Sequence, residues 1–372
     1  MKKFLSFAIC CLMFALGCAQ GTKEKSSFKV EPAAPNTPVF TLAWSEYPSW
    51  SVFGVLGELG AIAPEKGKVG VFEKKHNVDL VLAEADYDPC ITGYGTGSYD
   101  AVCVTNIDAL NPSRSKKSVV TLFNSTSAGG DALVVTDAVK TIEDLFGKDI
   151  RGLDLSVAPY CLYRNFEIRG LDPNKIKFTQ NDPGAAAQAM QQGQAGYDAI
   201  QVWNPYKRQT LKTTPKARVL TDKDGKPFDS SMIPGEIIDA VVFSQDALKR
   251  EGGTRAADCI NEAYYHFSGM LNDKSQKDAL LVALGAKFST MNAEDMSLCL
   301  VDTKLYSTAT EGSTLVKSDE FKKVMEKIVP WCKAHHYFDS PAAVETPTIA
   351  WGDWKTSEAN LTFDSSFMEN AK

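Results

Sequence analysis

Apolar residues fall into short runs along the first two thirds of the chain, and segments with helical spacing separate those runs. Each run is too short for a helix and has polar residues on both sides, which is typical of a buried strand. The runs predict strands at residues 39–44, 78–82, 99–106, 119–123, 132–135, 147–155, 176–178, 198–203 and 237–243. The spacing between them predicts helices near residues 51–59, 159–169 and 183–192. This alternation is typical of an α/β fold with a mostly parallel sheet.

The chain after the last of these strands has a different pattern. Apolar residues that include Ile260 and Tyr264 recur at helical spacing, and so do others that include Phe321 and Ile328. We therefore expect the remainder to be mainly helical. Each of these two sets of apolar residues would form one helix face that packs into a core. The stretch after His335 has no clear period, and we expect it to form an irregular cover.

One strand pattern occurs twice. Tyr99-Asp-Ala-Val-Cys-Val-Thr-Asn106 returns 98 residues later as Tyr197-Asp-Ala-Ile-Gln-Val-Trp-Asn204. In open α/β sheets, ligands bind just beyond the carboxyl ends of such strands. Two similar strand ends, one in each half of the chain, predict two similar lobes that face each other across a cleft.

Length and composition fit this picture. With 372 residues, 44% of them hydrophobic and 23% charged, the chain is long enough for two globular domains with their own cores. The net charge is −6, and no lysine- or arginine-rich helix face stands out. These features argue against nucleic-acid binding.

The N-terminus predicts export. Two lysines precede an apolar run over residues 4–16, which is shorter than a membrane-spanning helix and has the length found in signal peptides. The run ends at a small residue before Cys18, as in bacterial lipoproteins, so we expect residues 1–17 to be a signal peptide and Cys18 to be lipidated. Cleavage after Ala19 is the alternative. Residues 18–38 are polar and proline-rich, as expected of a flexible tether.

The remaining cysteines and histidines do not indicate a metal or an enzyme. The body of the chain contains Cys90, Cys103, Cys161, Cys259, Cys299 and Cys332. None forms a CxxC pair or a zinc-type His/Cys spacing, and we assign no disulfide bridge. The sequence also lacks G-x-S-x-G, H-E-x-x-H and phosphate-loop motifs. We therefore expect no metal, no cofactor and no enzymatic activity.

Several segments resemble the substrate-binding proteins of ABC importers, in the nitrate/sulfonate/taurine-type branch. They are Leu42-Ala-Trp-Ser-Glu-Tyr47, Tyr99-Asp-Ala-Val, Thr105-Asn-Ile-Asp-Ala-Leu110, Gly129-Gly-Asp131, Leu155-Ser-Val157, Trp203-Asn-Pro205 and Ser231-Met-Ile-Pro-Gly-Glu-Ile-Ile-Asp239. Together they look like the subgroup associated with urea carboxylases, for which urea or guanidine is the implied ligand. The sequence departs from that pattern at Ala158-Pro-Tyr160.

The resemblance implies the two-lobed type II periplasmic-binding-protein fold, with two hinge crossings. We predict a first part of lobe 1 at residues 39–131, lobe 2 at 132–238, and a mostly helical return to lobe 1 at 239–372. The crossings are expected near residues 132–135 and 239–243.

Side chains at the predicted strand ends are acidic, aromatic or amide, and no lysine or arginine is among them. The candidate ligand-binding residues are Trp44, Glu46, Tyr47, Asn106, Asp108, Asp131, Ser156, Trp203, Asn204, Glu236 and Asp239. Carboxylates and indole or phenol rings suit guanidinium, which has only N–H donors and a flat face. Urea would add a need for one donor to its carbonyl. The helix beginning at Ser156 offers an N-terminus that could hold an anion instead.

We therefore expect a monomeric solute-binding protein in the periplasm or at the cell surface, attached to the membrane only by its lipid. It would capture a small ligand by lobe closure and deliver it to an ABC permease in the inner membrane. The alternatives are a binder of nitrate, a sulfonate or taurine, and an enzyme or sensor module of the same fold.

Overall fold

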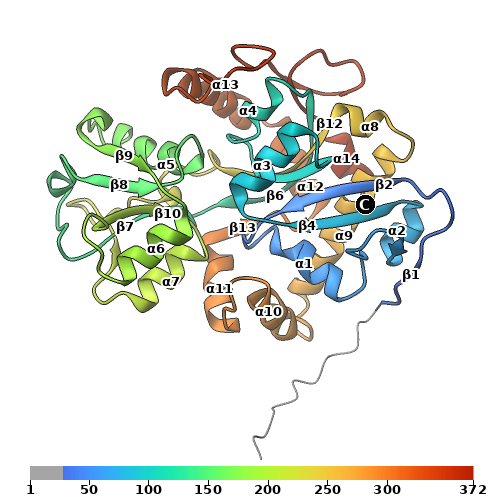
Figure 1. Cartoon of the computed structure of the whole chain (residues 1–372), viewed down its shortest axis with the longest axis horizontal. Helices are drawn as coiled ribbons and strands as arrows, with labels where there is room; N and C mark the ends of the chain where they lie inside the picture. The colour runs from blue at the N-terminus through green and yellow to red at the C-terminus, as the bar shows by residue number, and fades with distance from the viewer. Residues whose placement is uncertain (1–27, 372) are drawn as a thin grey trace, which may run out of the picture.

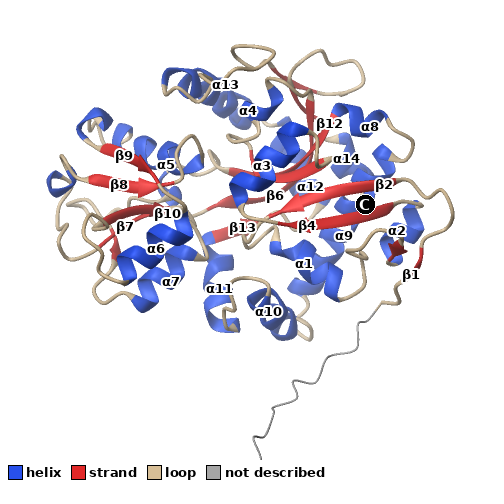
Figure 2. Ribbon diagram, in the orientation of Figure 1, coloured by secondary structure: helices blue, strands red, loops and turns tan. Residues whose placement is uncertain are grey.

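The computed structural model describes residues 28–371 and has two α/β lobes, each built around its own sheet (Figure 1). Figure 2 shows helices on both sides of the strands in each lobe. The predicted two-lobed α/β fold is confirmed. The predicted signal peptide and Cys18 lie outside the described residues.

Lobe 1 contains a sheet in the order β14-β15-β6-β12-β5-β2-β4, and β13 pairs with β6 off this path. Its strands are β2 (Val39–Trp44), β4 (Asp79–Glu84), β5 (Ala101–Thr105), β6 (Ser118–Ser127), β12 (Ile238–Ser244), β13 (Thr303–Leu305), β14 (Ile349–Trp351) and β15 (Leu361–Phe363). The helices of this lobe are α1 (Ser51–Glu58), α2 (Val71–His76), α3 (Tyr87–Thr96), α4 (Leu110–Ser113), α8 (Gln245–Lys249), α9 (Gly253–Asn272), α10 (Lys277–Ala286), α11 (Ala293–Asp302), α12 (Ala309–Lys317), α13 (Asp319–Ala334) and α14 (Ser366–Asn370).

Lobe 2 contains a smaller sheet in the order β11-β7-β10-β8-β9. Its strands are β7 (Ala132–Val135), β8 (Asp149–Gly152), β9 (Lys177–Gln180), β10 (Ala199–Val202) and β11 (Arg218–Val219). The helices are α5 (Val157–Glu167), α6 (Pro183–Gln191) and α7 (Tyr206–Thr213), with 3₁₀ turns η1 (Glu143–Leu145), η2 (Pro173–Lys175) and η3 (Ser230–Met232).

The two chain crossings between the lobes explain why the sheets are mixed rather than mostly parallel. The chain leaves lobe 1 from β6 and enters lobe 2 at β7, and it returns after η3 into β12. β12 runs antiparallel to both β5 and β6. β7 runs antiparallel to β10, whereas β2 runs parallel to both β4 and β5 in lobe 1. The return strand β12 thus lies between β6 and β5 at the centre of the large sheet.

The N-terminal and C-terminal segments pack more regularly than the sequence suggested. Part of the predicted tether forms β1 (Glu31–Pro32), which pairs antiparallel with β3 (Lys68–Val69) on lobe 1. Near the C-terminus, β14 and β15 are parallel to each other, and β15 is parallel to β6. This corrects the expected irregular cover, because the segment extends the sheet of lobe 1.

The structure shows the state of the cysteines and the lengths of the helices. All six cysteines among residues 28–371 are buried and unpaired. Burial raises the pKa of Cys103, Cys161 and Cys259 well above the usual thiol value, so these thiols are packing residues. Within the same range, no helix combines the length and apolarity needed to span a bilayer.

Candidate functional site

A small enclosed cavity lies where the two crossings meet the two lobes. It is lined by Tyr47, Trp50, Tyr87, Thr105, Asp131, Val157, Trp203 and Asp239. Its volume is about 10 Å³ as the space open to the centre of a water-sized sphere, close to the smallest space that holds one water molecule. A ligand of this cavity is therefore small and nearly surrounded by protein.

Aromatic rings form one wall of the cavity. After β2, the carbonyl of Tyr47 accepts the N–H groups of Trp50 and Ser51, which turns the chain into α1. The Trp50 and Tyr87 rings stack with centroids 5.4 Å apart, and Tyr87 meets Trp203 edge to face at 5.6 Å. Lobe 1 supplies the first two rings and lobe 2 supplies Trp203, so the wall is complete only when the lobes are together.

Two carboxyl groups face the same cavity from the hinge. Asp131, which precedes β7, is 3% exposed and accepts a 2.5 Å hydrogen bond from Ser127. Asp239, on β12, is 1% exposed and accepts a short hydrogen bond from Ser125. In each carboxylate only Oδ2 accepts a side-chain hydrogen bond from the described residues, so Oδ1 remains for a ligand.

A third carboxyl group, Asp108, lies directly behind the aromatic wall. It is 5% exposed, and its Oδ2 accepts hydrogen bonds from the Tyr87 hydroxyl at 2.7 Å and the Val157 N–H at 3.2 Å. Val157 is the first residue of α5, and Ser156 caps the same helix by accepting the Ala158 N–H. A carboxylate of lobe 1 thus occupies the positive helix end at which an anion would otherwise bind.

Burial without a facing base makes these three acids hard to ionise. Burial raises the pKa of Asp108 to about 7 and that of Asp131 to about 6. The pKa of Asp239 is raised well above its usual value by burial and then by Asp131 and Asp108. Ionising these acids is therefore costly in the ligand-free protein, and a bound cation would lower that cost.

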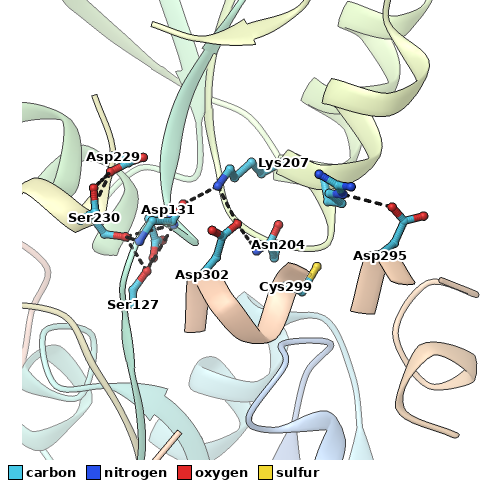
Figure 3. Close-up of polar contacts among 12 residues, drawn as sticks. Ser127, Asp131, Asn204, Lys207, Asp229, Ser230, Asp295, Cys299 and Asp302 are labelled. Carbon is cyan, nitrogen blue, oxygen red and sulfur yellow. Dashed lines mark hydrogen bonds and ion pairs between the residues drawn. The ribbon is translucent and has the colours of Figure 1, made fainter. Parts of the chain in front are cut away.

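Lys207 on α7 is a base whose charge acts on Asp131, and it already has partners (Figure 3). Its Nζ donates to the Gly129 carbonyl at 2.7 Å and to Asp302 at 2.8 Å. It is 7% exposed, and its charge lowers the pKa of Asp131 without forming an ion pair with it. Lys207 fixes the hinge to α11 and forms no direct ion pair with a cavity acid.

A wider interlobe cleft lies outside the cavity, beyond Tyr87 and Trp203. One part has a volume of about 680 Å³ and another about 540 Å³, and Asp88, Leu153 and Gln180 line both. Tyr87 and Trp203 line the larger part as well as the cavity. These two rings separate the cavity from the cleft.

The structure brings four of the eleven predicted ligand residues to the cavity, namely Tyr47, Asp131, Trp203 and Asp239, with Asp108 behind them. The other residues have different partners. Trp44 packs against Gly54 of α1, Asn106 bonds the backbone of Glu236 and Ile238, and Asn204 donates weakly to Asp302.

Two predicted acceptors do not line the cavity and are engaged by other residues. Glu236 forms a two-bond ion pair with Arg164, with both distances 2.9 Å, and accepts the Tyr160 hydroxyl at 2.6 Å. Glu46 accepts the N–H and hydroxyl of Ser289 in the loop between α10 and α11, and it lines the outer cleft.

The predicted ligand set omitted Trp50 and Thr105, which stand at the predicted strand ends, as well as Tyr87 and Val157; all four also line the cavity. Tyr87 begins the helix after β4, so the strand-end rule applied elsewhere in the chain would have found it. Trp50 lies three residues after Tyr47 in the same turn. Among residues 28–371, no group of His, Cys, Asp and Glu side chains is arranged to hold a metal ion.

No protein-family model matches the sequence, and no curated protein matches it. Solved structures do match. The periplasmic aliphatic sulphonate binding protein SsuA from Escherichia coli is 16% identical with a TM-score of 0.62, over 82% of this chain and 90% of that chain. The alkanesulfonate-binding protein SsuA from Xanthomonas axonopodis pv. citri, bound to MOPS, is 17% identical with a TM-score of 0.61, over 84% and 98%.

The ligand-binding component of an ABC-type import system from Staphylococcus aureus, with zinc bound, is 13% identical with a TM-score of 0.60, over 83% of this chain and 96% of that chain. At these identities the likeness shows the fold alone. The chain therefore has the two-lobed fold of periplasmic binding proteins, and its ligand has to be inferred from its own cavity.

Proposed function

We propose that this chain is an extracytoplasmic solute-binding protein that captures guanidinium, or a cation of similar size and shape, and delivers it to an ABC permease. The observation that carries the proposal is the set of three buried carboxyl groups, Asp108, Asp131 and Asp239, around an aromatic cavity that no lysine, arginine or histidine among residues 28–371 lines. A buried charge needs a partner, and a cationic ligand provides one.

Guanidinium matches the two kinds of wall in this cavity. Its edge carries N–H donors for the free oxygens of Asp131 and Asp239, in charge-assisted hydrogen bonds. Its flat face can lie on an aromatic ring, and Trp50 and Trp203 offer such rings. Its four heavy atoms need more space than the single water that the cavity admits, so binding requires the walls to move apart a little. A sulfonate with an organic tail would need a still larger opening.

The helix end that would favour an anion is already occupied. The Val157 N–H bonds Asp108, and the Ala158 N–H bonds Ser156. An anion placed there would lie beside the Asp108 carboxylate and would be repelled by it. The occupied helix end therefore supports a cation over nitrate, a sulfonate or taurine.

Urea is a second candidate, and a separate observation favours it. The Tyr47 hydroxyl and the Trp50 indole N–H are buried and have no hydrogen-bond partner among the described residues. Both residues line the cavity. Either donor could bond the urea carbonyl, while the carboxyl groups accept its N–H groups.

Capture requires closure of the lobes, because each lobe supplies part of the shell. Tyr47, Trp50, Tyr87, Thr105 and Asp239 belong to lobe 1, whereas Val157 and Trp203 belong to lobe 2. An open form would expose the carboxyl groups to solvent and to ligand. Closure would bring Trp203 against Tyr87 and exclude water, and we propose that the permease binds this closed form.

Thermal unfolding with a ligand panel tests the proposal. A ligand that binds only the native state stabilises it, by about 2.7 kcal/mol when its concentration is 100 times its Kd. We expect millimolar guanidinium to raise Tm, urea to raise it less, and nitrate and taurine to leave it unchanged. Sodium chloride at equal ionic strength is the control.

The variant Asp239→Asn should greatly reduce the guanidinium shift. Asp79→Asn is the matched control, because Asp79 is equally buried in lobe 1 but bonds the Gly67 N–H, away from the cavity. A shift with nitrate or taurine and none with guanidinium or urea would overturn the proposed ligand class.

A further inference from the structure

The interlobe cleft outside the cavity has walls of one charge. Its larger part contains Glu46, Glu84, Asp86, Asp88 and Asp182. Its smaller part adds Asp108 and Asp154. None of the described residues that line either part is lysine, arginine or histidine, so the cleft is acidic from end to end.

Other grooves on the protein surface are not lined by acids alone. A third groove of about 680 Å³, on the outer side of lobe 2, is lined by Lys140, Arg169, Lys223 and Lys226 as well as by Glu143, Asp222 and Asp224. Acids and bases alternate there, as on most protein surfaces. The uniform charge is therefore a property of the cleft between the lobes.

Asp108 provides an independent indication that the cleft serves a cation. It is 5% exposed, it lines the smaller part of the cleft, and its Oδ1 has no hydrogen-bond partner among the described residues. A buried carboxylate oxygen without a donor is unfavourable unless a ligand or water supplies one. Its other oxygen bonds Tyr87, which separates the cleft from the cavity.

The field of the acids reaches the far wall of the cleft. Tyr206 of lobe 2 lines the larger part, and its pKa is raised by burial and then by the charges of Asp182, Glu46 and Asp86. Lys287 is the base that acts on Glu84, and it is paired with Glu58 at 2.8 Å. Nothing among the described lining residues neutralises this field.

We propose that the cleft is an electrostatic access route that concentrates cations in front of Tyr87 and Trp203 and so selects the ligand by charge before the lobes close. This inference rests on the proposed function, since it presumes a cationic ligand for the cavity. Clefts of one charge with walls of low dielectric constant focus the field and raise association rates. The cleft acids therefore act on the association rate, and the cavity acids act on the dissociation rate.

Association kinetics test this division of roles. Guanidinium binding is followed by stopped-flow tryptophan fluorescence, because Trp50 and Trp203 line the cavity, at several sodium chloride concentrations. The triple variant Glu84→Gln, Asp86→Asn, Asp88→Asn removes three exposed carboxylates from one rim of the cleft. We expect it to lower the association rate roughly three- to tenfold at low salt and to leave the dissociation rate unchanged. The difference should vanish near 1 M salt, where charges are screened within about 3 Å.

The matched control is Asp278→Asn, Glu320→Gln, Glu326→Gln. It makes the same change in net charge at exposed positions on α10 and α13, and none of these residues lines the cleft. If the control slows association as much as the cleft variant, net charge alone is responsible and the inference is overturned.

Equilibrium titration of the wild-type protein separates this inference from the proposed function. Failure of guanidinium to bind removes both. Binding with an association rate that does not change with salt removes only the access route and leaves the cavity assignment in place. A rate that falls with salt for guanidinium and stays constant for urea, which is neutral, supports the access route.

Discussion

Asp108 of lobe 1 accepts the N–H of Val157, the first residue of α5 in lobe 2, at 3.2 Å. The same oxygen accepts the Tyr87 hydroxyl. One carboxylate thus joins the two lobes, fixes a ring of the cavity wall and occupies a helix N-terminus. Its negative charge there is favourable for the helix. A free helix N-terminus would attract an anionic ligand, whereas this carboxylate repels one.

Asp108→Asn should weaken guanidinium binding roughly tenfold or more, because it removes one of three charges that favour a cation. The amide keeps an acceptor for Val157, so lobe contacts should persist. Isothermal titration calorimetry measures the change, with Asp79→Asn as the control. Equal affinity in Asp108→Asn and the wild type would show that this charge plays no part in selection.

The stability of the ligand-free protein should fall as pH rises from about 4 to 7. Asp131 and Asp108, with pKa values of about 6 and about 7 in the folded state, bind more protons than they would in the unfolded chain, where the pKa is about 3.9. Their stabilising effect is complete below pH 4 and is lost as pH rises through the folded values. The loss should be on the order of 1–3 kcal/mol for each group.

Glu73 contributes in the same direction, because burial raises its pKa to about 7. The free energy of unfolding is therefore measured by urea unfolding at each pH for the wild type and for Asp131→Asn, and its slope against pH is compared between the two. A smaller slope in the variant assigns part of the effect to the cavity. An unchanged slope would mean that Asp131 titrates normally.

Guanidinium affinity should rise with pH over the interval in which stability falls. The cation binds the ionised carboxylates, so below a pKa of about 6 it must displace a proton from Asp131. We expect affinity to increase roughly tenfold between pH 5 and 7.5. Calorimetry in two buffers of different ionisation enthalpy would show proton release. A guanidinium affinity that stays constant or falls as pH rises would show that the cation does not bind the ionised carboxylates.

Much of the architecture was predictable because it depends on local pattern. The apolar runs before Trp44 and Thr105, with a polar stop after each, locate two strand ends that meet at the cavity, and both β2 and β7 have the predicted bounds. β14 and β15 were missed because three-residue strands carry too little periodicity to separate them from loops.

The partners of individual side chains were not predictable in this way. Arg164 lies two turns into α5, yet it reaches Glu236, which is 72 residues away in sequence. Glu46 is held by Ser289, at a separation of 243 residues. Strand-end position indicates that a polar side chain is near the cleft, and only tertiary packing decides whether another residue binds it first.

Asp239 and Glu236 are three residues apart, yet neutralising them should have opposite effects. Loss of the Asp239 charge should weaken guanidinium binding, and loss of the Glu236 charge should weaken stability. Asp239→Asn should lower guanidinium affinity tenfold to a hundredfold, since it removes a charge-assisted acceptor. It should not reduce stability, because burial, and then the charges of Asp131 and Asp108, disfavour the ionised Asp239 carboxylate. Titration calorimetry and urea unfolding of the same samples give both quantities.

Glu236→Gln is the complement. It breaks the two-bond ion pair with Arg164, so unfolding should become easier by about 1–3 kcal/mol while affinity changes less than about twofold. Loss of guanidinium binding in Glu236→Gln without loss of stability would restore Glu236 as a ligand residue and contradict the assignment made from the structure.

Lys207→Met should destabilise the protein by about 1–3 kcal/mol, because Lys207 is buried and joins α7 to the Gly129 carbonyl and to Asp302 of α11. The loss leaves Asp302 without its ion-pair partner and removes the charge that lowers the pKa of Asp131. The pKa of Asp131 should therefore rise, and the increase of guanidinium affinity with pH should move to higher pH. Lys216→Met is the control, because Lys216 pairs with Asp137 at the surface, where such pairs contribute little to stability. Equal stability losses in the two variants, or an unmoved pH profile in Lys207→Met, would show that Lys207 does not couple the hinge to the cavity.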